Sequence, residues 1–546
     1  MHWRFENKKK DGTMRKLSTA ILLFAAHLAF ADATKLDVSI NPEKTFQTID
    51  NFTAADAWSG NFAGQYFAAP QKEQIAKWLF SQKLGADGNP EGIGLSMWRI
   101  NIGGGTLEQD GADIQPYQRR AESFLTKDGK HYDWGKCSGQ QYFMRKAKEY
   151  GCDKFLLFSN TPPVQWTKNG KGYMDFKSCA SNLKPDCYGK FADYMADVAK
   201  HFESQGYNIA YISPINEPQG DWNTNRQEGS VWRLSEMAKM ARELDKSISE
   251  SGLENTKILL GESCSYKACI DGIAAKDIMW SKLYEKNCPP EELPISQLKV
   301  FFSKDSPHYL GDLKNLHKVW AAHAYGSCHK FKDAIDIRKK LAAETEKYSV
   351  GFIQSEWCML PRKNILEGFS KDWQSDNFAD MQSSLKMARI ISLDLTIAQS
   401  QGWGYWKGME VKGDHALVGL YPKNGRLEDG GVARANKMLW ALGNYSLFIR
   451  PGFKRVDLAG ADDVSNVLGS AFISPDGKRI VAVFVNSSFD PVAADISMPS
   501  DCQKKIAKVS AFKTDERSDL SNLRVSDLSK FVFSPRSITT FVYDLN

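Results

Sequence analysis

Eight short apolar segments with strand character alternate with longer segments of helical periodicity between residues 49 and 447, and this alternation constrains the fold most strongly. The predicted strands are 49–56, 93–101, 155–160, 209–217, 257–263, 319–325, 352–356 and 398–406. The predicted helices between them include 188–205, 231–251, 333–348 and 378–400. Strands that alternate with helices form parallel sheets, and eight such units close a barrel. We therefore predict an α/β fold, a (β/α)8 TIM barrel over residues 49–447.

The pattern changes after Ser446, where short alternating runs are separated by turn signals. The pair Asp476-Gly477 lies between two such runs in SAFISPDGKRIVAVFVNSS, which is typical of a β-hairpin. We predict an attached antiparallel β-sandwich over residues 448–546. Residues 32–48 also have strand character, and we expect this N-terminal strand to join the sandwich.

The first 31 residues predict export. Two basic residues precede an apolar run over 20–30 that ends among small residues, which is typical of a signal peptide cleaved before Asp32. Residues 1–13 have no place in such a signal, so Met14 is the expected start. The alternative is an uncleaved membrane anchor, which the short apolar run disfavours. We expect a secreted mature chain, located outside the cell, at its surface or in the periplasm.

The net charge of +6 is concentrated in the segment expected to be removed. Residues 1–13 carry four basic and two acidic side chains, and residues 14–31 carry two basic ones, which leaves +2 for the mature chain. A nearly neutral chain offers no electrostatic reason to bind nucleic acid or an anionic membrane. Ten cysteines in an exported chain permit disulfides, and Cys179 with Cys187 and Cys264 with Cys269 are candidate pairs by their short spacing.

Two predicted strands end in glutamate, and function in a parallel barrel lies at the C-terminal ends of the strands. Asn216 and Glu217 end the fourth strand before Pro218, and Glu356 ends the seventh. Two carboxylates at one barrel mouth match the need of glycosidic cleavage for a proton donor and a nucleophile or base. An Asn-Glu-Pro tripeptide alone would indicate a helix cap or a turn, but the barrel context favours chemistry.

Other strand ends add candidate polar groups. Arg99 is a cation that can hold Glu356 ionised, or alternatively a surface arginine. His323 and Tyr325 leave the same face of their strand, where they can orient the nucleophile and the substrate or form a buried pair. The remaining polar strand ends, with substrate binding as their expected role, are Asp56, Asn160 and the rival carboxylate Glu262.

Aromatic residues near the strand ends indicate a sugar-binding cleft, because the C–H faces of sugars stack on flat apolar rings. The candidate tryptophans are Trp58, Trp166, Trp222, Trp403 and Trp406. Each alone is more often a core residue. Five near predicted loops, in a chain with 15 tryptophans, favour at least one sugar platform.

Other chemistries receive less support from the sequence. The cluster His323, Cys328 and His329 lacks a second ligand pair at zinc-like spacing, so we assign it a structural role and predict no metal. Only 9 histidines are present and no His-x-His pair ends a strand, which disfavours a metal-dependent hydrolase. The glycines 103–105 do not have the spacing of a dinucleotide-binding loop, and neither a P-loop nor a nucleophile elbow is present.

The strand-end motifs resemble those of glycoside hydrolase family 30, a family of retaining (β/α)8 glycosidases, over nearly the whole mature chain. The matching segments are TIDNFTAADAWSG, IGLSMWRINIGGG, FSNTPPVQWTKNG, ISPINEPQGDWN, FIQSEW, QGWGYWKG, SLFIRPGFKRVD, DGKRIVAVFVN and SPRSITTFVYD. The resemblance implies Glu217 as acid/base, Glu356 as nucleophile and Asn216 as a partner of the sugar 2-hydroxyl. It also implies that Trp403 or Trp406 floors the cleaved subsite, that no cofactor is needed, and that Glu217 exchanges its proton as the charge on Glu356 changes.

Substrates in this family include β-1,6-galactan, β-1,6-glucan and glucuronoxylan. NIGGGTLEQDGADIQPYQRRAESF and SNTPPVQWTKNG resemble most the branch of endo-β-1,6-galactanases. GMEVKGDHALVGLYPKNGR has no clear counterpart of the arginine-bearing loop of glucuronoxylanases. We expect a monomer that cleaves a plant-type polysaccharide or its oligosaccharides; a carbohydrate-binding protein without turnover is the alternative of another class.

Overall fold

The computed structural model describes residues 35–109, 111–278, 288–327, 331–359, 381–411, 416–523 and 531–546. The expected signal peptide and its cleavage site, Cys328, His329 and the first three residues of the predicted helix 378–400 lie outside this part of the chain. Within it, no helix has the length and the apolar character needed to cross a membrane.

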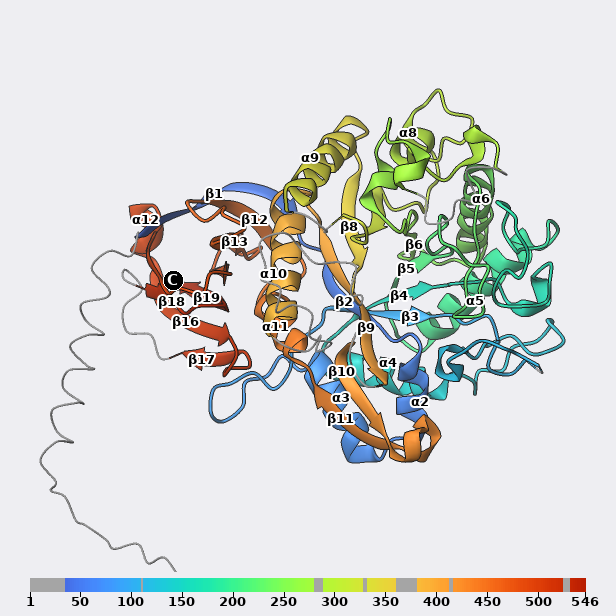
Figure 1. The fold of residues 1–546 in the computed structure, drawn as a ribbon, viewed down its shortest axis with the longest axis horizontal. Coiled ribbons are helices and arrows are strands. Elements are labelled where there is room, and N and C mark those ends of the chain that lie inside the picture. The colour runs from blue at the N-terminus through green and yellow to red at the C-terminus, as the bar shows by residue number, and fades with distance from the viewer. Residues whose placement is uncertain are drawn as a thin grey trace, which may run out of the picture.

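Eight parallel strands form a closed barrel (Figure 1). They are β2 (Asn51–Ala55), β3 (Met97–Asn101), β4 (Lys154–Phe158), β5 (Ile209–Ser213), β6 (Lys257–Ile258), β7 (Val319–His323), β8 (Gly351–Glu356) and β9 (Gly402–Val411). Strand β9 pairs with both β8 and β2, and single parallel bridges connect the β6 segment to the β7 segment. Each predicted strand overlaps one of these, so the prediction of a (β/α)8 barrel is confirmed.

Helices cover the outside of the barrel. They are α2 (Ser59–Tyr66), α3 (Ala69–Phe80), α4 (Ser138–Glu149), α5 (Tyr188–Ser204), α6 (Leu234–Glu250), α8 (Gln297–Phe302), α9 (Phe331–Lys347), α10 (Met381–Thr396) and α11 (Lys437–Ser446). Helix α5 buries one face, including Phe191, Met195 and Phe202, as its helical spacing of apolar residues requires. After β9, the sheet continues through β10 (Ala416–Pro422) and β11 (Gly431–Ala435), which the sequence pattern did not predict.

A second, nine-stranded sheet contains the chain after α11 and the N-terminal strand. Its strands are β1 (Leu36–Thr48), β12 (Lys454–Ala459), β13 (Val467–Ile473), β14 (Arg479–Asn486), β15 (Val492–Ser497), β16 (Ile506–Thr514), β17 (Ser521–Leu523), β18 (Phe531–Phe533) and β19 (Ser537–Leu545). Strand β1 pairs antiparallel with β12 and parallel with β15. The predicted turn at Asp476-Gly477 connects β13 to β14, with Gly477 at φ +71°.

Helices α10 and α11 lie between the barrel and the second sheet (Figure 1). Side chains of β14 alternate across that sheet: Val481, Val483 and Val485 belong to the core that contains the barrel, whereas Ala482 and Phe484 belong to a separate core on the other face. The apolar core therefore continues from the barrel into the C-terminal sheet.

Candidate active site

Alternation along the barrel strands directs polar side chains toward the mouth of the barrel. On β3, Trp98 packs against Phe80 of α3 with ring centroids 5.0 Å apart, and the next residue, Arg99, points to the opposite side. The guanidinium of Arg99 lies 3.7 Å from the ring centre of Phe158 at the end of β4. The cation–π attraction between the Phe158 ring and the guanidinium holds the positive charge of Arg99 at the centre of the site.

Backbone contacts fix the position of Glu217 beyond the end of β5. Its φ of +44° lies in the left-handed region, which costs a non-glycine residue about 1 kcal/mol. Its N–H donates to the carbonyl of Glu262 at 2.8 Å, and its carbonyl accepts from the backbone N–H of Gly220 at 2.8 Å and from Nε1 of Trp222 at 3.0 Å. These contacts hold the residue in a conformation that presents its carboxylate to the barrel axis.

The carboxylate of Glu356, at the end of β8, faces that of Glu217. One carboxylate oxygen of each glutamate and a ring nitrogen of His323 lie within 4.8 Å of one another. Arg99 Nη1 donates to Glu356 Oε2 at 2.6 Å, and Nη2 donates to Asn216 Oδ1 at 3.2 Å. The sequence therefore placed Arg99, Asn216, Glu217 and Glu356 in one site, where the structure brings them into contact.

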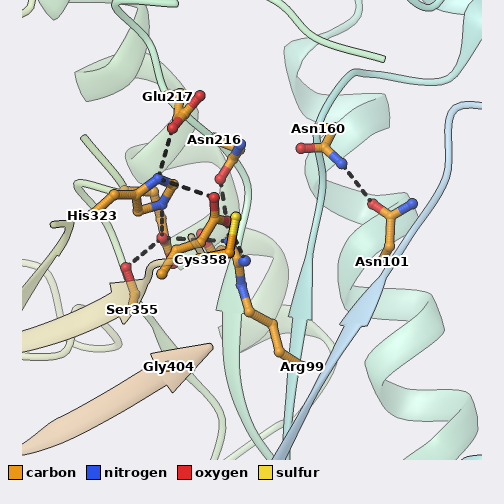
Figure 2. Close-up of polar contacts among 12 residues, drawn as sticks. Arg99, Asn101, Asn160, Asn216, Glu217, His323, Ser355, Cys358 and Gly404 are labelled. Carbon is orange, nitrogen blue, oxygen red and sulfur yellow. Dashed lines mark hydrogen bonds and ion pairs between the residues drawn. The ribbon is translucent and has the colours of Figure 1, made fainter. Parts of the chain in front are cut away.

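The imidazole of His323 connects three carboxylates (Figure 2). Its Nδ1 lies 2.9 Å from Glu217 Oε1 and 3.4 Å from Glu356 Oε1, and its Nε2 lies 2.8 Å from Glu262 Oε2. Burial opposes a charge on the ring, but the charges of Glu356 and Glu217 and the hydrogen bonds overcome it and raise the pKa of His323 to about 10. The ring is therefore an imidazolium near neutral pH.

The other two carboxylates respond differently to the same surroundings. Burial would raise the pKa of Glu262, but Arg99, His323 and Ser355 lower it to about 2. For Glu356, burial wins: together with the nearby charge of Glu217, it raises the pKa above the ordinary value against the opposing pull of His323 and Arg99. Glu262 is thus an anion near neutral pH, whereas the pKa of Glu356 is held above its ordinary value.

The side chain of Glu262 lies behind His323 and is enclosed by other side chains of the protein. Its side chain is 0% exposed, and its Oε2 accepts from His323 and from the hydroxyl of Ser355 at 2.7 Å, with Arg99 at 3.5 Å. Its other oxygen, Oε1, is buried without a hydrogen-bond partner among the described residues, and the binding of a sugar hydroxyl by Glu262 stays a prediction. Its hydrogen bond to His323 helps to keep the imidazolium charged.

Tyr325 lies beside His323, with ring centroids 5.9 Å apart. Its hydroxyl donates to the sulfur of Cys358 at 3.5 Å, and burial raises the pKa of Tyr325 well above its usual range. Ser355 and Cys358 flank Glu356 and were not predicted as site residues. Their signal was available in the sequence QSEWC, since both lie within two residues of a glutamate at a strand end.

Asp56 and Asn160 belong to a network on the other side of Arg99. Asp56 Oδ1 accepts from the backbone N–H of Asn101 at 2.9 Å and Oδ2 from Gln140 at 2.7 Å, while burial raises the pKa of Asp56 to about 7. Asn160 donates to Asn101 Oδ1 at 3.2 Å (Figure 2). Asp56 is 1% exposed and both of its oxygens accept hydrogen bonds within the protein, while its contact with substrate stays a prediction. It orients the end of β3.

Two of the five candidate tryptophans form an aromatic corner next to Arg99. Trp58 and Trp406 meet edge to face with ring centroids 5.4 Å apart, and Trp406 also contacts Phe158 at 6.0 Å. Trp406 keeps 8% of its surface exposed. It therefore remains a candidate for the ring that stacks on a sugar.

The other three tryptophans have structural surroundings. Trp403 is 0% exposed and its Nε1 donates to the buried Asp394 at 3.0 Å, so its ring packs in the core, and its role as the floor of a subsite stays a prediction. A Cβ atom on Gly220 or Gly229 would clash with the indole of Trp222, so the two glycines pack directly against this ring. Trp166 packs against Tyr194 with centroids 6.0 Å apart and is nearly buried.

A buried carboxylate that the sequence did not single out fixes the loop after β3. Glu228 accepts from the N–H of Gly104 at 3.2 Å and from the hydroxyl of Thr106 at 2.6 Å, and burial raises its pKa to about 7. A Cβ on Gly104 would clash with Thr161, which explains why glycine occupies this position. Nearby, a hollow of about 330 Å³ is lined by Gly105, Glu108, Gln109, Lys127, Val164, Gln165 and Gly170.

Glu217, His323 and Glu356 are also the group of described residues whose donor atoms lie close enough to hold a metal ion. A histidine must lose its ring proton to become a ligand, and the pKa of His323 of about 10 opposes this near neutral pH. The donor set therefore fits proton transfer better than metal binding.

A barrel that brings two carboxylates this close together at its strand ends has the arrangement of a glycoside hydrolase. The chain belongs to glycoside hydrolase family 30: the model of O-Glycosyl hydrolase family 30 matches residues 35–415, and that of the family's beta sandwich domain matches residues 452–541. The resemblance found in the sequence motifs is thereby confirmed.

Similar proteins agree with this family. An endo-beta-1,6-galactanase from Hypocrea rufa is 27% identical over 257 residues, which are 44% of this chain and 51% of that enzyme, so the chain spans about half of its length. A conserved exported protein from Bacteroides fragilis has a solved structure with a TM-score of 0.82 and 31% identity, covering 92% of this chain and 99% of that one. The catalytic domain of xylanase C from Talaromyces cellulolyticus has the same fold, with a TM-score of 0.62, 20% identity and coverage of 93% and 99%.

Proposed function

We propose that this chain is exported and hydrolyses internal β-1,6 linkages of a galactan with retention of configuration. The observation that carries the proposal is the approach of Glu217 and Glu356, whose nearest carboxylate oxygens lie within 4.8 Å. Retaining glycosidases separate their carboxyl groups by about 5 to 5.5 Å and inverting ones by about 6.5 to 9.5 Å, so the shorter spacing supports a double displacement. The similarity to an endo-beta-1,6-galactanase and to an exported protein supports the linkage and the location.

In the first step, Glu356 attacks the anomeric carbon while Glu217 gives its proton to the leaving oxygen. The carbon–oxygen bond to the leaving group breaks, and a glycosyl ester forms on Glu356. In the second step, water attacks the same carbon, Glu217 accepts the proton of that water, and the ester bond to Glu356 breaks. Atoms and charges return to their starting state.

Arg99 and His323 stabilise the negative charge as it moves between the two glutamates. Arg99 contacts only Glu356 of this pair, at 2.6 Å, which favours the ionised nucleophile. Nδ1 of His323 lies near both, at 2.9 Å from Glu217 and 3.4 Å from Glu356, so its N–H can donate to whichever carboxylate is anionic. Glu356 and Glu217 are the main groups that raise the pKa of His323, and the hydrogen bond to Glu262 adds to them.

The test is product release from β-1,6-galactan, β-1,6-glucan and glucuronoxylan by the chain from Asp32 to Asn546, beside its Glu356→Gln variant. We expect a ladder of galacto-oligosaccharides from the first polymer, lost in the variant. Cleavage of another polymer would keep the glycosidase and replace the linkage. Binding of a polymer without any product would favour the alternative of a carbohydrate-binding protein and overturn the proposed activity.

A further inference from the structure

A small apolar cluster, separate from the barrel core, lies behind Glu217. Its members come from the loops that follow β4, β5 and β6, and they are Met174, Cys179, Trp222, Val231, Cys288 and Leu293. Trp222 is the residue whose indole donates to the carbonyl of Glu217. Three separate loops therefore meet at one point next to the proposed acid/base.

Two cysteines of this cluster are in contact. The thiol of Cys288 is hydrogen-bonded to Cys179, although 109 positions separate them in the sequence. Cys179 is 2% and Cys288 is 8% exposed. Arg233, at the start of α6, donates to the sulfur of Cys179 from Nε and Nη2, both at 3.2 Å.

We propose that Cys179 and Cys288 form a disulfide in the exported protein, which rests on the proposed export. The expected partner of Cys179 was Cys187, whose sulfur contacts Asp186 Oδ1 at 3.7 Å, whereas the structure gives Cys179 a hydrogen bond with Cys288. The Cys264–Cys269 pairing stays a prediction. An oxidising compartment is where such a bond forms and persists.

The oxidant is a protein or small-molecule disulfide. Cys179, to whose sulfur Arg233 donates, loses its proton and attacks one sulfur of the oxidant, and the sulfur that leaves takes up a proton and departs as a thiol. Cys288 then loses its proton and attacks the mixed disulfide, which forms the Cys179–Cys288 bond and releases the second thiol of the oxidant. Two electrons and two protons pass to the oxidant, and because both sulfurs are buried, the reaction takes place as the loops fold.

The bond would connect the loop after β4 to the loop after β6 across the loop that carries Glu217. A disulfide that closes a loop of roughly 100 residues belongs to the range with the largest expected stabilisation. It would also limit movement of Trp222, which packs in the same cluster and holds the Glu217 carbonyl. The proposal thus assigns a covalent support to the position of the acid/base.

Peptide mapping tests the pairing without any need for activity. The exported full-length chain is denatured without reductant, its thiols are alkylated, and it is digested. We expect one linked peptide pair that contains Cys179 and Cys288 and lacks two hydrogens, while Cys187 and Cys502 are alkylated. Alkylation of both Cys179 and Cys288, or a link from Cys179 to Cys187, would overturn the proposal.

A second arm separates this result from a failure of the proposed export. The reduced chain, unfolded in denaturant and refolded in a mixture of reduced and oxidised glutathione, is expected to form the same link, and its absence would overturn the pairing wherever the protein resides. Reductant is expected to lower the Tm of the oxidised wild type and of Cys502→Ser by several degrees, but not that of Cys179→Ser/Cys288→Ser. If the double variant does not fold, the wild-type mapping still decides.

Discussion

At the scale of single residues, His323 is the group that connects the charged side chains of the site. Its ring contacts Glu217, Glu262 and Glu356, and each contact favours the protonated form. Glu262 in turn is ionised because His323 and Arg99 are charged. His323 and Glu262 form a buried ion pair. Removal of one partner of such a pair leaves the charge of the other uncompensated and costs several kcal/mol of stability.

Stability should depend on pH through this pair. The pKa of His323 is raised from 6.5 to about 10, so its contribution is complete below about 6.5 and is lost as the pH rises toward 10. The pKa of Glu262 is lowered from 4.5 to about 2, so its contribution is complete above 4.5 and is lost as the pH falls toward 2. We expect the alkaline slope, up to about 1.4 kcal/mol per pH unit from this group, to be smaller in His323→Gln.

The free energy of unfolding measured between pH 5 and 10 in both proteins checks this expectation, and equal alkaline slopes would contradict it. If the variant does not fold, NMR titration of the imidazole ring in the wild type measures the pKa of His323 directly. A ring that loses its proton below pH 8 would show that the charges around it do not retain it.

The proposed nucleophile predicts a chemical rescue. Glu356→Gly removes the carboxylate that forms the glycosyl ester, so turnover should fall to near background. Azide fits the space left by the side chain and should attack the anomeric carbon directly, which gives a glycosyl azide of inverted configuration. Chromatography and NMR of the product identify the azide, and Arg99→Gly, which keeps Glu356, serves as the control without rescue.

The proposed acid predicts a dependence on the leaving group. Glu217→Gln keeps the size of the side chain but cannot give a proton, so kcat/KM should fall by about 10²- to 10⁴-fold for natural glycosides. Aryl glycosides with acidic phenols need little protonation and should lose much less in the glycosylation step. A plot of log kcat/KM against phenol pKa measures this, and equal losses for all substrates would count against the acid role.

At the scale of secondary-structure elements, β9 separates two tryptophans by function. Trp403 points toward α10 and donates to Asp394, which is also paired with Arg338, whereas Trp406 joins Trp58 at the mouth of the barrel. The two side chains are three residues apart on a strand, and so face opposite sides. The family resemblance left both as candidates, and of the two the structure places Trp406 beside Trp58 and Arg99.

Substitution of each tryptophan should therefore affect a different quantity. Trp403→Ala should destabilise the fold by about 3–5 kcal/mol and leave kcat/KM of the folded protein nearly unchanged. Trp406→Ala should lower kcat/KM at least tenfold, with a smaller change in stability, because it removes the ring next to Arg99 and Trp58. Denaturation curves and kinetics on the same preparations check both, and the reverse assignment would contradict the orientation of β9.

The sequence predicted the barrel strands well because each is a short apolar run that ends in polar residues. It also placed Arg99, Asn216, Glu217, His323 and Glu356 in one site, since the ends of parallel strands converge. Strand β10 and strand β11 were missed, because they extend the sheet outside the βα repeat and have no periodicity that differs from a loop.

The sequence did not predict how deeply each candidate side chain is buried. Asp56, Glu262 and Trp403 end or follow strands as candidate ligands do, and the structure buries all three. Whether such a residue faces the substrate depends on the long-range neighbours that surround it, for example Gln140 at Asp56 and Ser355 at Glu262. Glu228 was missed for the same reason, since only the fold brings it to Gly104.

At the scale of the whole molecule, the barrel and the C-terminal sheet share one apolar core. Helix α10 contacts β9 of the barrel and also β13, β14 and β19 of the sheet. The N-terminal strand β1 adds a covalent connection, since it belongs to the second sheet and leads directly into β2. Two regions should unfold together when they share a core and when the strand that precedes one of them belongs to the sheet of the other.

We therefore expect a single thermal transition by calorimetry. Val483 lies in the shared core, and Val483→Asp would bury an unpaired carboxylate at a cost of roughly 4 kcal/mol. With about 2 cal/mol/K of unfolding entropy per residue, a cooperative unit of roughly 500 residues should lose about 4 °C in Tm, and the temperature at which catalysis is lost should fall equally. Val532→Asp, at an exposed position of β18, is the matched control and should leave Tm unchanged. Two separate transitions, with only the first shifted by Val483→Asp and activity unaffected, would show that the sheet is an independent unit attached to the barrel.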